Sequence, residues 1–302
     1  MTKCKLCSRK AVIHLKYFDR HLCKNHFIEL TEQRIRKNIT RNNLLDKEDK
    51  IAVAVSGGKD SVSMLHFLYN SIQKYKLDLF GIVVDEGIEG YRNTSAQAAV
   101  DNLEKLGVDY KLVKFKDEYG KSMDEIAPDN MERSCTYCGV LRRRILNKYA
   151  KEAEADKLAT GHNLDDEVQS VFMNYLRGDF TRLKRTGAKT PKLKGFIQRI
   201  KIMRDVPENE IELYANLKGF KIHPKRCPYV SGSLRNDTRD MLNEFEEKHP
   251  GSKFSLLSGA DKLSDLIDVE KFSGPELKEC KKCGEPTASE ICKVCKLIEK
   301  VS

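Results

Sequence analysis

Apolar residues along the chain follow the spacing of strands and of helices in turn. The run at residues 50–55 is short, apolar and rich in β-branched side chains, as a buried strand requires. It leads through a turn with two glycines into residues 61–73, where Val62, Leu65 and Leu68 recur at helical spacing. This part of the sequence predicts a strand, a turn and a helix, in that order.

The same alternation continues beyond this unit. The further expected strands lie at 79–85, 108–115 and 157–160, and the further expected helices at 93–106, 208–218 and 235–248, with another helix carrying Val168, Val171, Phe172 and Tyr175. Strands that alternate with helices are typical of an α/β fold with a doubly wound, mainly parallel sheet. We therefore expect this fold class for the central part of the chain.

Length and composition exclude several classes of protein. The 302 residues, of which 40% are hydrophobic, suffice for one large domain or for a medium domain with small appendages. No run approaches the roughly 18 apolar residues that span a bilayer, and the first ten residues lack the apolar segment of a secretory signal. We therefore expect a cytoplasmic protein without membrane association.

Cysteine is the most informative residue type in this sequence. The ten cysteines form three sets, which are Cys4, Cys7 and Cys23; Cys135, Cys138 and Cys227; and Cys280, Cys283, Cys292 and Cys295. Without a secretory signal, such cysteines are expected to be thiols, metal ligands or catalytic groups rather than structural disulfides.

Two of these sets have the spacing of structural zinc sites. The expected ligands are Cys4, Cys7, Cys23 and His26 near the N-terminus, and Cys280, Cys283, Cys292 and Cys295 near the C-terminus. Segments this short bury too little apolar surface to fold unaided, so bound metal supplies the missing free energy. His14 and His21 are possible substitutes for His26, but neither completes a paired spacing.

The turn after the first predicted strand has the composition of a phosphate loop. Residues 56–61 read SGGKDS, and their glycines let backbone N–H groups approach an anion closely. Lys59 adds a positive charge. Ligands of open α/β sheets bind beyond the carboxyl ends of strands, which is where this turn falls.

The SGGKDS turn after an apolar strand resembles the PP-loop, or N-type ATP pyrophosphatase, family. Its members cleave ATP between the α- and β-phosphates and adenylate a carbonyl or carboxylate oxygen. A second family feature is the GHNLDDE stretch at 161–167, in which Asp166, in preference to Asp165, would position Mg²⁺ or the phosphates. Asn163 could equally cap a helix whose first turn prefers acids, and both interpretations can hold. The ATP-binding residues implied are Ala54, Val55, Ser56, Gly57, Gly58, Lys59, Asp60, Ser61, Val84, Arg142, Gly161 and Asp166.

The remaining cysteines extend the resemblance. Alone, Cys135 and Cys138 could be a redox dithiol, half a zinc site or two packed thiols. Together with Cys227, the phosphate loop and both zinc modules, they resemble the tRNA 2-thiolation enzymes, in a match that runs from Cys4 to Cys295. The resemblance implies a [4Fe–4S] cluster on these three cysteines, whose fourth iron stays open to sulfide. A mechanism with a persulfide and a resolving cysteine, without a cluster, remains an alternative.

This resemblance implies ATP-dependent adenylation of uridine O2 in tRNA, followed by sulfur transfer to C2. The residues expected to act in catalysis are Cys135, Cys138, Cys227, Lys59, Asp60 and Asp166. The sulfur donor could be a ubiquitin-like thiocarboxylate carrier, a desulfurase product or free sulfide, and relatives are often homodimers. Two alternatives are a PP-loop enzyme with an amine nucleophile and a non-catalytic, zinc-dependent RNA-binding protein.

The distribution of charge favours a nucleic-acid partner. Lys and Arg number 55 against 45 Asp and Glu, and residues 182–204 hold nine basic residues and no acidic one. The residues expected to bind tRNA are Arg143, Arg182, Lys184, Arg185 and Lys189. Arg142 lies four residues after Cys138 on the same helix face, so it is assigned to the ATP phosphates, although it too could bind tRNA.

We expect four parts along the chain. These are an N-terminal zinc finger at 1–28, a helical connector at 29–48, a PP-loop catalytic domain at 49–270 and a C-terminal zinc ribbon at 271–302. The expected cofactors are ATP, Mg²⁺, the [4Fe–4S] cluster and two Zn²⁺.

Overall fold

A five-stranded parallel sheet forms the centre of the molecule. The computed structural model describes residues 2–127, 134–184, 186–230, 234–266 and 277–301. The sheet has the order β5-β4-β3-β6-β7, with β3 (Lys50–Ala54), β4 (Asp78–Asp85), β5 (Tyr110–Lys114), β6 (Lys157–Ala159) and β7 (Gln198–Ile200). The chain adds strands outward from β3 on one side and then returns to add β6 and β7 on the other. The doubly wound, parallel sheet expected from the sequence is confirmed, and its topological switch point lies between β3 and β6.

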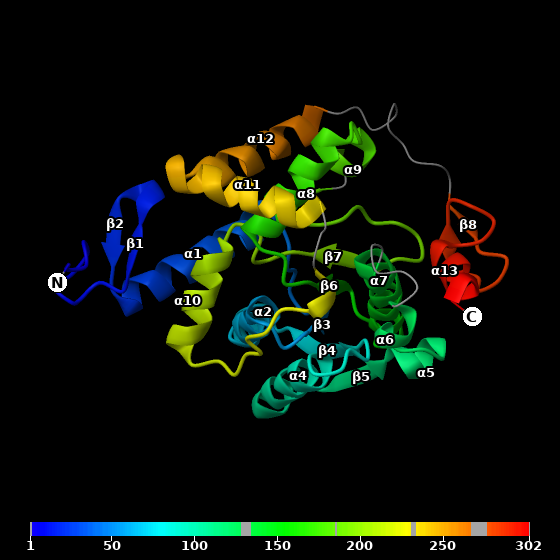
Figure 1. Ribbon diagram of the computed structural model, residues 1–302. Coiled ribbons are helices and arrows are strands. Elements are labelled where there is room, and N and C mark those ends of the chain that lie inside the picture. The colour runs from blue at the N-terminus through cyan, green and yellow to red at the C-terminus, as the bar shows by residue number, and fades with distance from the viewer. Residues whose placement is uncertain (1, 128–133, 185, 231–233, 267–276, 302) are drawn as a thin grey trace.

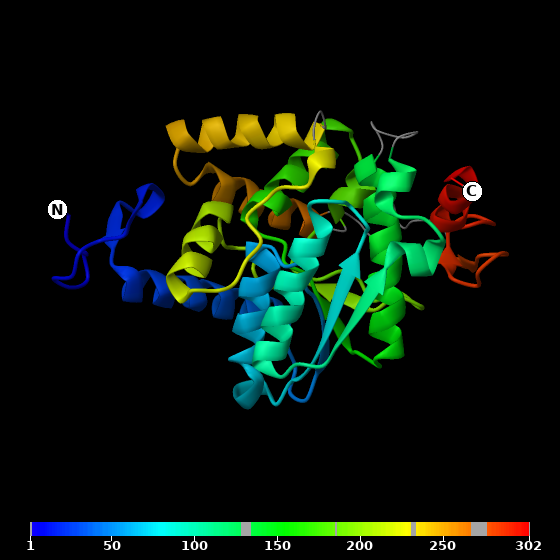
Figure 2. The same cartoon turned by 60° about the horizontal axis from the view of Figure 1, so that its bottom comes forward.

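Helices cover both faces of this sheet (Figures 1 and 2). The helices are α1 (Lys24–Asn42), α2 (Lys59–Tyr69), α3 (Ile72–Tyr75), α4 (Arg92–Leu106), α5 (Phe115–Tyr119), α6 (Met123–Ile126), α7 (Ser134–Glu152), α8 (Leu164–Leu176), α9 (Phe180–Lys184), α10 (Glu208–Lys218), α11 (Leu234–Lys248), α12 (Ser252–Leu266) and α13 (Lys293–Val301), with 3₁₀ turns at Lys16–Phe18 and Pro228–Val230. One apolar core joins the sheet to α1, α2, α4 and α10, and a second joins its other face to α7 and α13.

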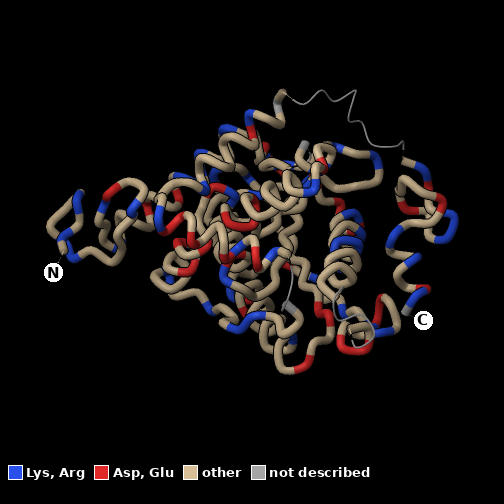
Figure 3. Tube along the Cα trace, turned by 45° about the horizontal axis from the view of Figure 1, so that its top comes forward, with Lys and Arg blue, Asp and Glu red and all other residues tan. Residues whose placement is uncertain are grey.

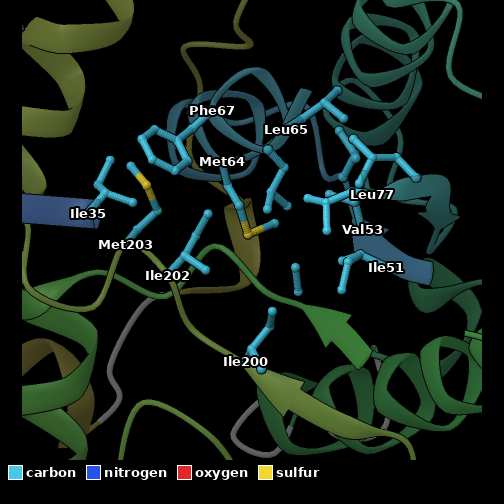
Figure 4. Close-up of a cluster of buried hydrophobic side chains, with 14 of the residues drawn as sticks. Ile35, Ile51, Val53, Met64, Leu65, Phe67, Leu77, Ile200, Ile202 and Met203 are labelled. Carbon is cyan, nitrogen blue, oxygen red and sulfur yellow. The ribbon is translucent and has the colours of Figure 1, made fainter. Parts of the chain in front are cut away.

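Alternating side chains of β3 supply both cores. Ile51 and Val53 belong to the core under α2, whereas Ala52 belongs to the core under α7. Figure 4 shows Met64 and Leu65 of α2 pointing toward these β3 side chains from above the sheet. Because side chains alternate between the two faces of a strand, a central strand needs apolar residues throughout. This is why residues 51–55 are continuously apolar.

The two terminal modules lie at opposite ends of the molecule (Figure 1). The N-terminal one pairs β1 (Ile13–Leu15) with β2 (Arg20–Leu22) and packs on Tyr214 of α10. The C-terminal one pairs β8 (Lys278–Glu279) with β9 (Pro286–Thr287), and its helix α13 packs Leu297 against the core under α7. Each module therefore has its own anchor on the central domain.

Most of the elements expected from the sequence are present. The helix expected at 208–218 is α10, and the helix expected at 93–106 is α4, which ends where Gly107 adopts a left-handed φ of 64°. The single helix expected at 61–73 is divided into α2 and α3 and begins two residues earlier, at Lys59. Within the described parts of the chain, no helix is long and apolar enough to cross a membrane.

Candidate active site

The phosphate loop follows β3 at the switch point of the sheet. The Ser56 N–H donates to Oγ of Ser61 at 3.0 Å, and the two hydroxyls lie 3.0 Å apart, so the loop folds back onto the first turn of α2. Gly57 has a φ of +84°, and a Cβ there would lie 1.9 Å from the Ser95 carbonyl oxygen of α4. Only glycine fits this position. The first N–H groups of the 11-residue helix α2 therefore face this turn, an arrangement that suits an anion.

The turn after β6 lies directly against the phosphate loop. A Cβ on Gly161 would come within 2.9 Å of the Ser61 amide nitrogen, so these two turns touch. Asn163 and Asp166 form a capping box at the start of α8, and Asn163 also donates to Asp60 Oδ1 at 2.8 Å. The helix-capping interpretation of this stretch is therefore confirmed, and the same residues contact the phosphate loop. The N-termini of α2 and α8 meet at one place.

Charged side chains surround this meeting point. Lys59 Nζ lies 2.9 Å from Glu208 and 3.3 Å from Asp60, while Asp166 lies 3.4 Å from Arg235 of α11. Burial raises the pKa of both Asp60 and Asp166. Carboxyl groups that are buried together suit a divalent cation, whose charge would stabilise their ionised forms.

Asp165, the other acid of the motif, has a different role. Its carboxylate pairs with Lys253 and accepts the Glu208 N–H at 2.7 Å. It therefore ties α8 to α10 and α12, and Asp166 is the acid left facing the phosphate loop.

The structure brings the three cysteines of the central set, Cys135, Cys138 and Cys227, to one place. Cys135 and Cys138 lie in the first turn and a half of α7, and Cys227 directly precedes the 3₁₀ turn at Pro228–Val230. The Cys135 thiol donates to the Tyr229 carbonyl at 3.5 Å, and Cys138 and Cys227 pack into the same apolar cluster. Burial raises the pKa of Cys138 to about 12 and also raises that of Cys227. The fold therefore brings Cys227 beside the CxxC pair, as the family resemblance implies.

The segment that carries Cys227 is fixed to the phosphate loop. The His223 N–H donates to the Gly57 carbonyl at 2.9 Å, and Asn102 of α4 donates to the Lys221 carbonyl at 2.8 Å. These bonds place residues 221–223 against α4 and the phosphate loop, four residues before Cys227. The anion site and the thiol site therefore share one edge of the sheet.

The two terminal cysteine sets each gather into a compact four-ligand group. Sulfur pairs lie 3.7 Å apart between Cys7 and Cys23, and 3.7 Å apart between Cys283 and Cys292. Four ligands around one ion at about 2.3 Å should be about 3.8 Å from each other, so both groups have the size of a tetrahedral metal site. These are the ligand sets expected from the sequence.

The choice of His26 as the fourth N-terminal ligand is now explained. Its Nδ1 lies 3.2 Å from Cys4 Sγ. His14 and His21 instead stack on each other with ring centres 4.0 Å apart, and His14 bonds Asp19 at 3.0 Å. Neither joins the ligand group.

The remaining nucleotide-site residues occupy the expected edge of the sheet. The Val55 N–H donates to the Ile82 carbonyl, and Ala54 is the last residue of β3. The Val84 carbonyl accepts from the buried Arg92, which is therefore its partner in the structure. Arg142 lies beside Glu86 at 3.4 Å, on the α7 face that also carries Cys138.

The basic residues expected to bind tRNA lie in different surroundings. Arg182 pairs with Asp179 at 3.1 Å, and Lys189 donates to the Asn43 carbonyl at 3.4 Å. Lys184 is the last residue of α9, and Arg185 lies outside the described residues. Arg143 lies on α7, where Figure 3 shows a run of basic positions.

Several site residues were not identified from the sequence. They are Glu86, Arg92, His162, Arg199, Glu208, Arg235 and Arg239. His162 lies within the GHNLDDE stretch, whereas the others reach the site through tertiary packing and have no motif of their own. Glu86 was within reach, because it directly follows a predicted strand and ligands bind at the carboxyl ends of strands.

Comparison with known proteins agrees with this geometry. Residues 28–226 match the PP-loop domain family, and residues 3–28 match the N-terminal LIM domain of the 2-thiouridine synthetase TtuA. The chain is 38% identical to the tRNA 2-thiolation protein NcsA of Haloferax volcanii, over 99% of both chains. The chain belongs to the PP-loop family of tRNA 2-thiolation proteins.

Other members of this family are similar over nearly their whole length. The tRNA-5-methyluridine(54) 2-sulfurtransferase of Pyrococcus horikoshii is 36% identical, over 97% of this chain and 93% of that one. A solved structure, the U34-tRNA thiolase NcsA from Methanococcus maripaludis with its [4Fe-4S] cluster, is 39% identical and superposes with a TM-score of 0.85. It covers 99% of this chain and 96% of its own.

The close contact between Gly57 and the Ser95 carbonyl leads to a testable prediction. Gly57→Ala should abolish ATP binding and destabilise the protein by about 1–3 kcal/mol, because the added Cβ meets backbone at a left-handed φ. Gly58→Ala is the matched control, since its Cβ would have only the Ser56 hydroxyl at 3.6 Å. Thermal unfolding and ATP titration measure both effects. Equal behaviour of the two variants would show that the loop is not constrained as described.

Proposed function

We propose that this chain adenylates O2 of a uridine in tRNA with ATP and then replaces that oxygen by sulfur, giving 2-thiouridine. It would thus be a tRNA-uridine 2-sulfurtransferase that releases pyrophosphate and AMP. The observation that carries the proposal is the 2.9 Å bond from the His223 N–H to the Gly57 carbonyl, which keeps the Cys227 segment against the phosphate loop. Full-length similarity to tRNA 2-thiolation proteins supports it.

The chemistry explains why the enzyme needs two half-sites, which are the phosphate loop and the three cysteines Cys135, Cys138 and Cys227. The C2 oxygen of uridine is a poor leaving group, whereas AMP is a good one. The N–H groups at the start of α2 and the Lys59 ammonium suit the phosphates of ATP, while Asp60 and Asp166 would hold Mg²⁺. Once O2 carries AMP, a sulfide can bond to C2 and the C2–O bond can break.

Cys135, Cys138 and Cys227 would hold the [4Fe–4S] cluster. Within the described residues, their sulfurs do not form a group as compact as the two single-ion sites. A cluster binds its thiolates on different iron atoms and therefore fits a wider trio. With three cysteine ligands, it supplies one open iron that can carry sulfide. Iron and sulfide analysis of anaerobically purified protein separates this proposal from the persulfide mechanism, which predicts no iron.

We propose zinc for both terminal four-ligand groups. Three thiolates with one imidazole, and four thiolates, are donor sets that zinc prefers in structural sites. The tetrahedral size of both groups supports this choice. Metal analysis that finds less than two zinc ions per chain would contradict it. The division into modules at 1–28 and 271–302, a connector at 29–48 and a catalytic domain at 49–270 belongs to the same proposal.

The tRNA would approach over α7 and the basic segment after α8. Arg143 supports this path because, among the described residues, it has no carboxylate partner. Burial lowers its pKa, and the neighbouring cations Arg199 and Arg142 lower it further. Neighbouring cations that repel each other suit the phosphates of a nucleic acid. Arg182, Lys184, Arg185 and Lys189 would extend this surface.

The proposal extends to the location of the protein, its assembly and its sulfur donor. A cytoplasmic location agrees with the name of a Xenopus laevis relative, cytoplasmic tRNA 2-thiolation protein 1, which is 35% identical. A homodimer agrees with a layer of exposed apolar side chains on α8, α11 and α12, including Leu176, Phe245 and Leu263. A sedimentation mass of one chain would contradict the dimer. The sulfur donor would be a thiocarboxylate carrier, a desulfurase product or free sulfide.

Two substitutions should separate the two half-reactions. Lys59→Ala removes the cation at the phosphate loop, so it should abolish tRNA-dependent pyrophosphate release and leave the iron content unchanged. Cys227→Ser should retain ATP binding and lose 2-thiouridine formation, as measured by nucleoside mass spectrometry of treated tRNA. Normal thiolation by the Cys227 variant would show that the sulfur site is assigned wrongly.

The tRNA surface predicts a change in salt dependence. Arg143→Gln should weaken tRNA binding and reduce the slope of log affinity against log salt by about 0.7–0.9, the value of one phosphate contact. Lys105→Gln, on the exposed surface of α4, is the control and should leave the slope unchanged. An unaltered slope for Arg143→Gln would remove this residue from the tRNA surface.

A further inference from the structure

A buried carboxylate lies between the two half-sites. Glu86 directly follows β4, and only 2% of its surface is exposed. Its Oε2 lies 2.5 Å from Arg92 Nε, and its Oε1 lies 3.4 Å from Arg142 Nη1. One arginine belongs to α4 and the other to α7, so Glu86 joins two helices from different sides of the sheet edge. Burying a carboxylate costs free energy unless cations compensate its charge, and here two arginines do so.

On the nucleotide side, Glu86 forms an ion pair with Arg92, and Arg92 is itself held by several hydrogen bonds. The guanidinium of Arg92 donates to the Ser56 carbonyl of the phosphate loop at 2.8 Å and to Ser95 Oγ at 2.8 Å. It also donates through Nε to the Val84 carbonyl at 2.8 Å. Arg92 has little freedom left, since it is 3% exposed. Glu86 therefore lies beside a fixed cation at the turn that would bind ATP.

On the thiol side, Arg142 depends on Glu86 for its position. About half of the Arg142 side chain is exposed, and Glu86 is its one carboxylate partner among the described residues. Arginine loses about 2 kcal/mol of rotamer entropy when it is fixed, so an unpaired guanidinium would sample many positions. Arg142 lies one helical turn after Cys138 on α7. The Cys138 sulfur is close enough to the Arg142 guanidinium to raise its pKa.

We propose that Glu86 positions the Arg142 guanidinium between the nucleotide phosphates and the thiol trio, where Arg142 stabilises the departing AMP. This rests on the proposed function. During sulfur transfer, a C2–S bond forms and the C2–O bond breaks, and the electron pair leaves with the oxygen of AMP. Negative charge therefore grows on the AMP phosphate, and a fixed cation there stabilises the transition state. Glu86 acts through Arg142 and exchanges no proton.

The test is a double-mutant cycle on 2-thiouridine formation. Arg142→Gln should lower kcat about 100-fold, and Glu86→Gln about 10- to 100-fold, while the KM for ATP changes less than about threefold. Because Glu86 acts through Arg142, the double variant should be no slower than Arg142→Gln alone. Multiplicative losses would overturn the proposal. So would a raised KM with unchanged kcat, which would assign Glu86 to the phosphate loop only.

Controls keep the result interpretable. Glu89→Gln removes an exposed carboxylate three residues further along and should leave kcat unchanged. If Glu86→Gln does not fold, Glu86→Asp keeps the charge beside Arg92 but withdraws it from Arg142, and the same cycle is measured with that variant. A wild-type chain that forms no 2-thiouridine would contradict the proposed function, whereas an active wild type with multiplicative losses contradicts only the role of Glu86.

Discussion

The site depends on a turn that has no room for a side chain. Gly57 lies against the Ser95 carbonyl so closely that a Cβ there would be 1.9 Å from its oxygen. This close approach lets the Gly57 carbonyl accept the His223 N–H, and lets the Ser56 carbonyl accept from Arg92. The nucleotide turn, the Cys227 segment and α4 are thus held together by backbone groups.

Close contacts also bring the N-termini of α2 and α8 together. Gly161 brings the turn after β6 against Ser61, and Asn163 bonds Asp60 while it caps α8. Side chains then complete the site from distant parts of the chain, with Glu208 from α10 and Arg235 from α11. The parallel sheet places all of these residues at the carboxyl ends of its strands, where a doubly wound fold binds its ligands.

Features that depend on a few neighbouring residues could be predicted from the sequence. The phosphate loop, both four-ligand groups and the bounds of α4, α10 and α11 follow from residue types at fixed spacing, because glycines, capping residues and paired cysteines act over a few positions. The alternation of apolar residues also predicted the fold class. The strand β7, with three residues, and the helix α12 were missed, since neither has a strong enough pattern of its own.

Residues that act through tertiary contacts could not be found in this way. Glu86 and Arg92 are ordinary charged residues in the sequence, and only the packing of α4 and α7 against β4 makes them a link between the half-sites. Charge alone marked the basic segment at 182–204, and it could not show that Arg182 pairs with Asp179.

The central claim is that ATP activates the base itself, at the oxygen that sulfur later replaces. It is tested most directly by following that oxygen, with tRNA whose target uridine carries ¹⁸O at C2. The account predicts that each 2-thiouridine formed is accompanied by one AMP with ¹⁸O in its phosphate, detected by mass spectrometry. Label that appears in water or pyrophosphate, with unlabelled AMP, would contradict it.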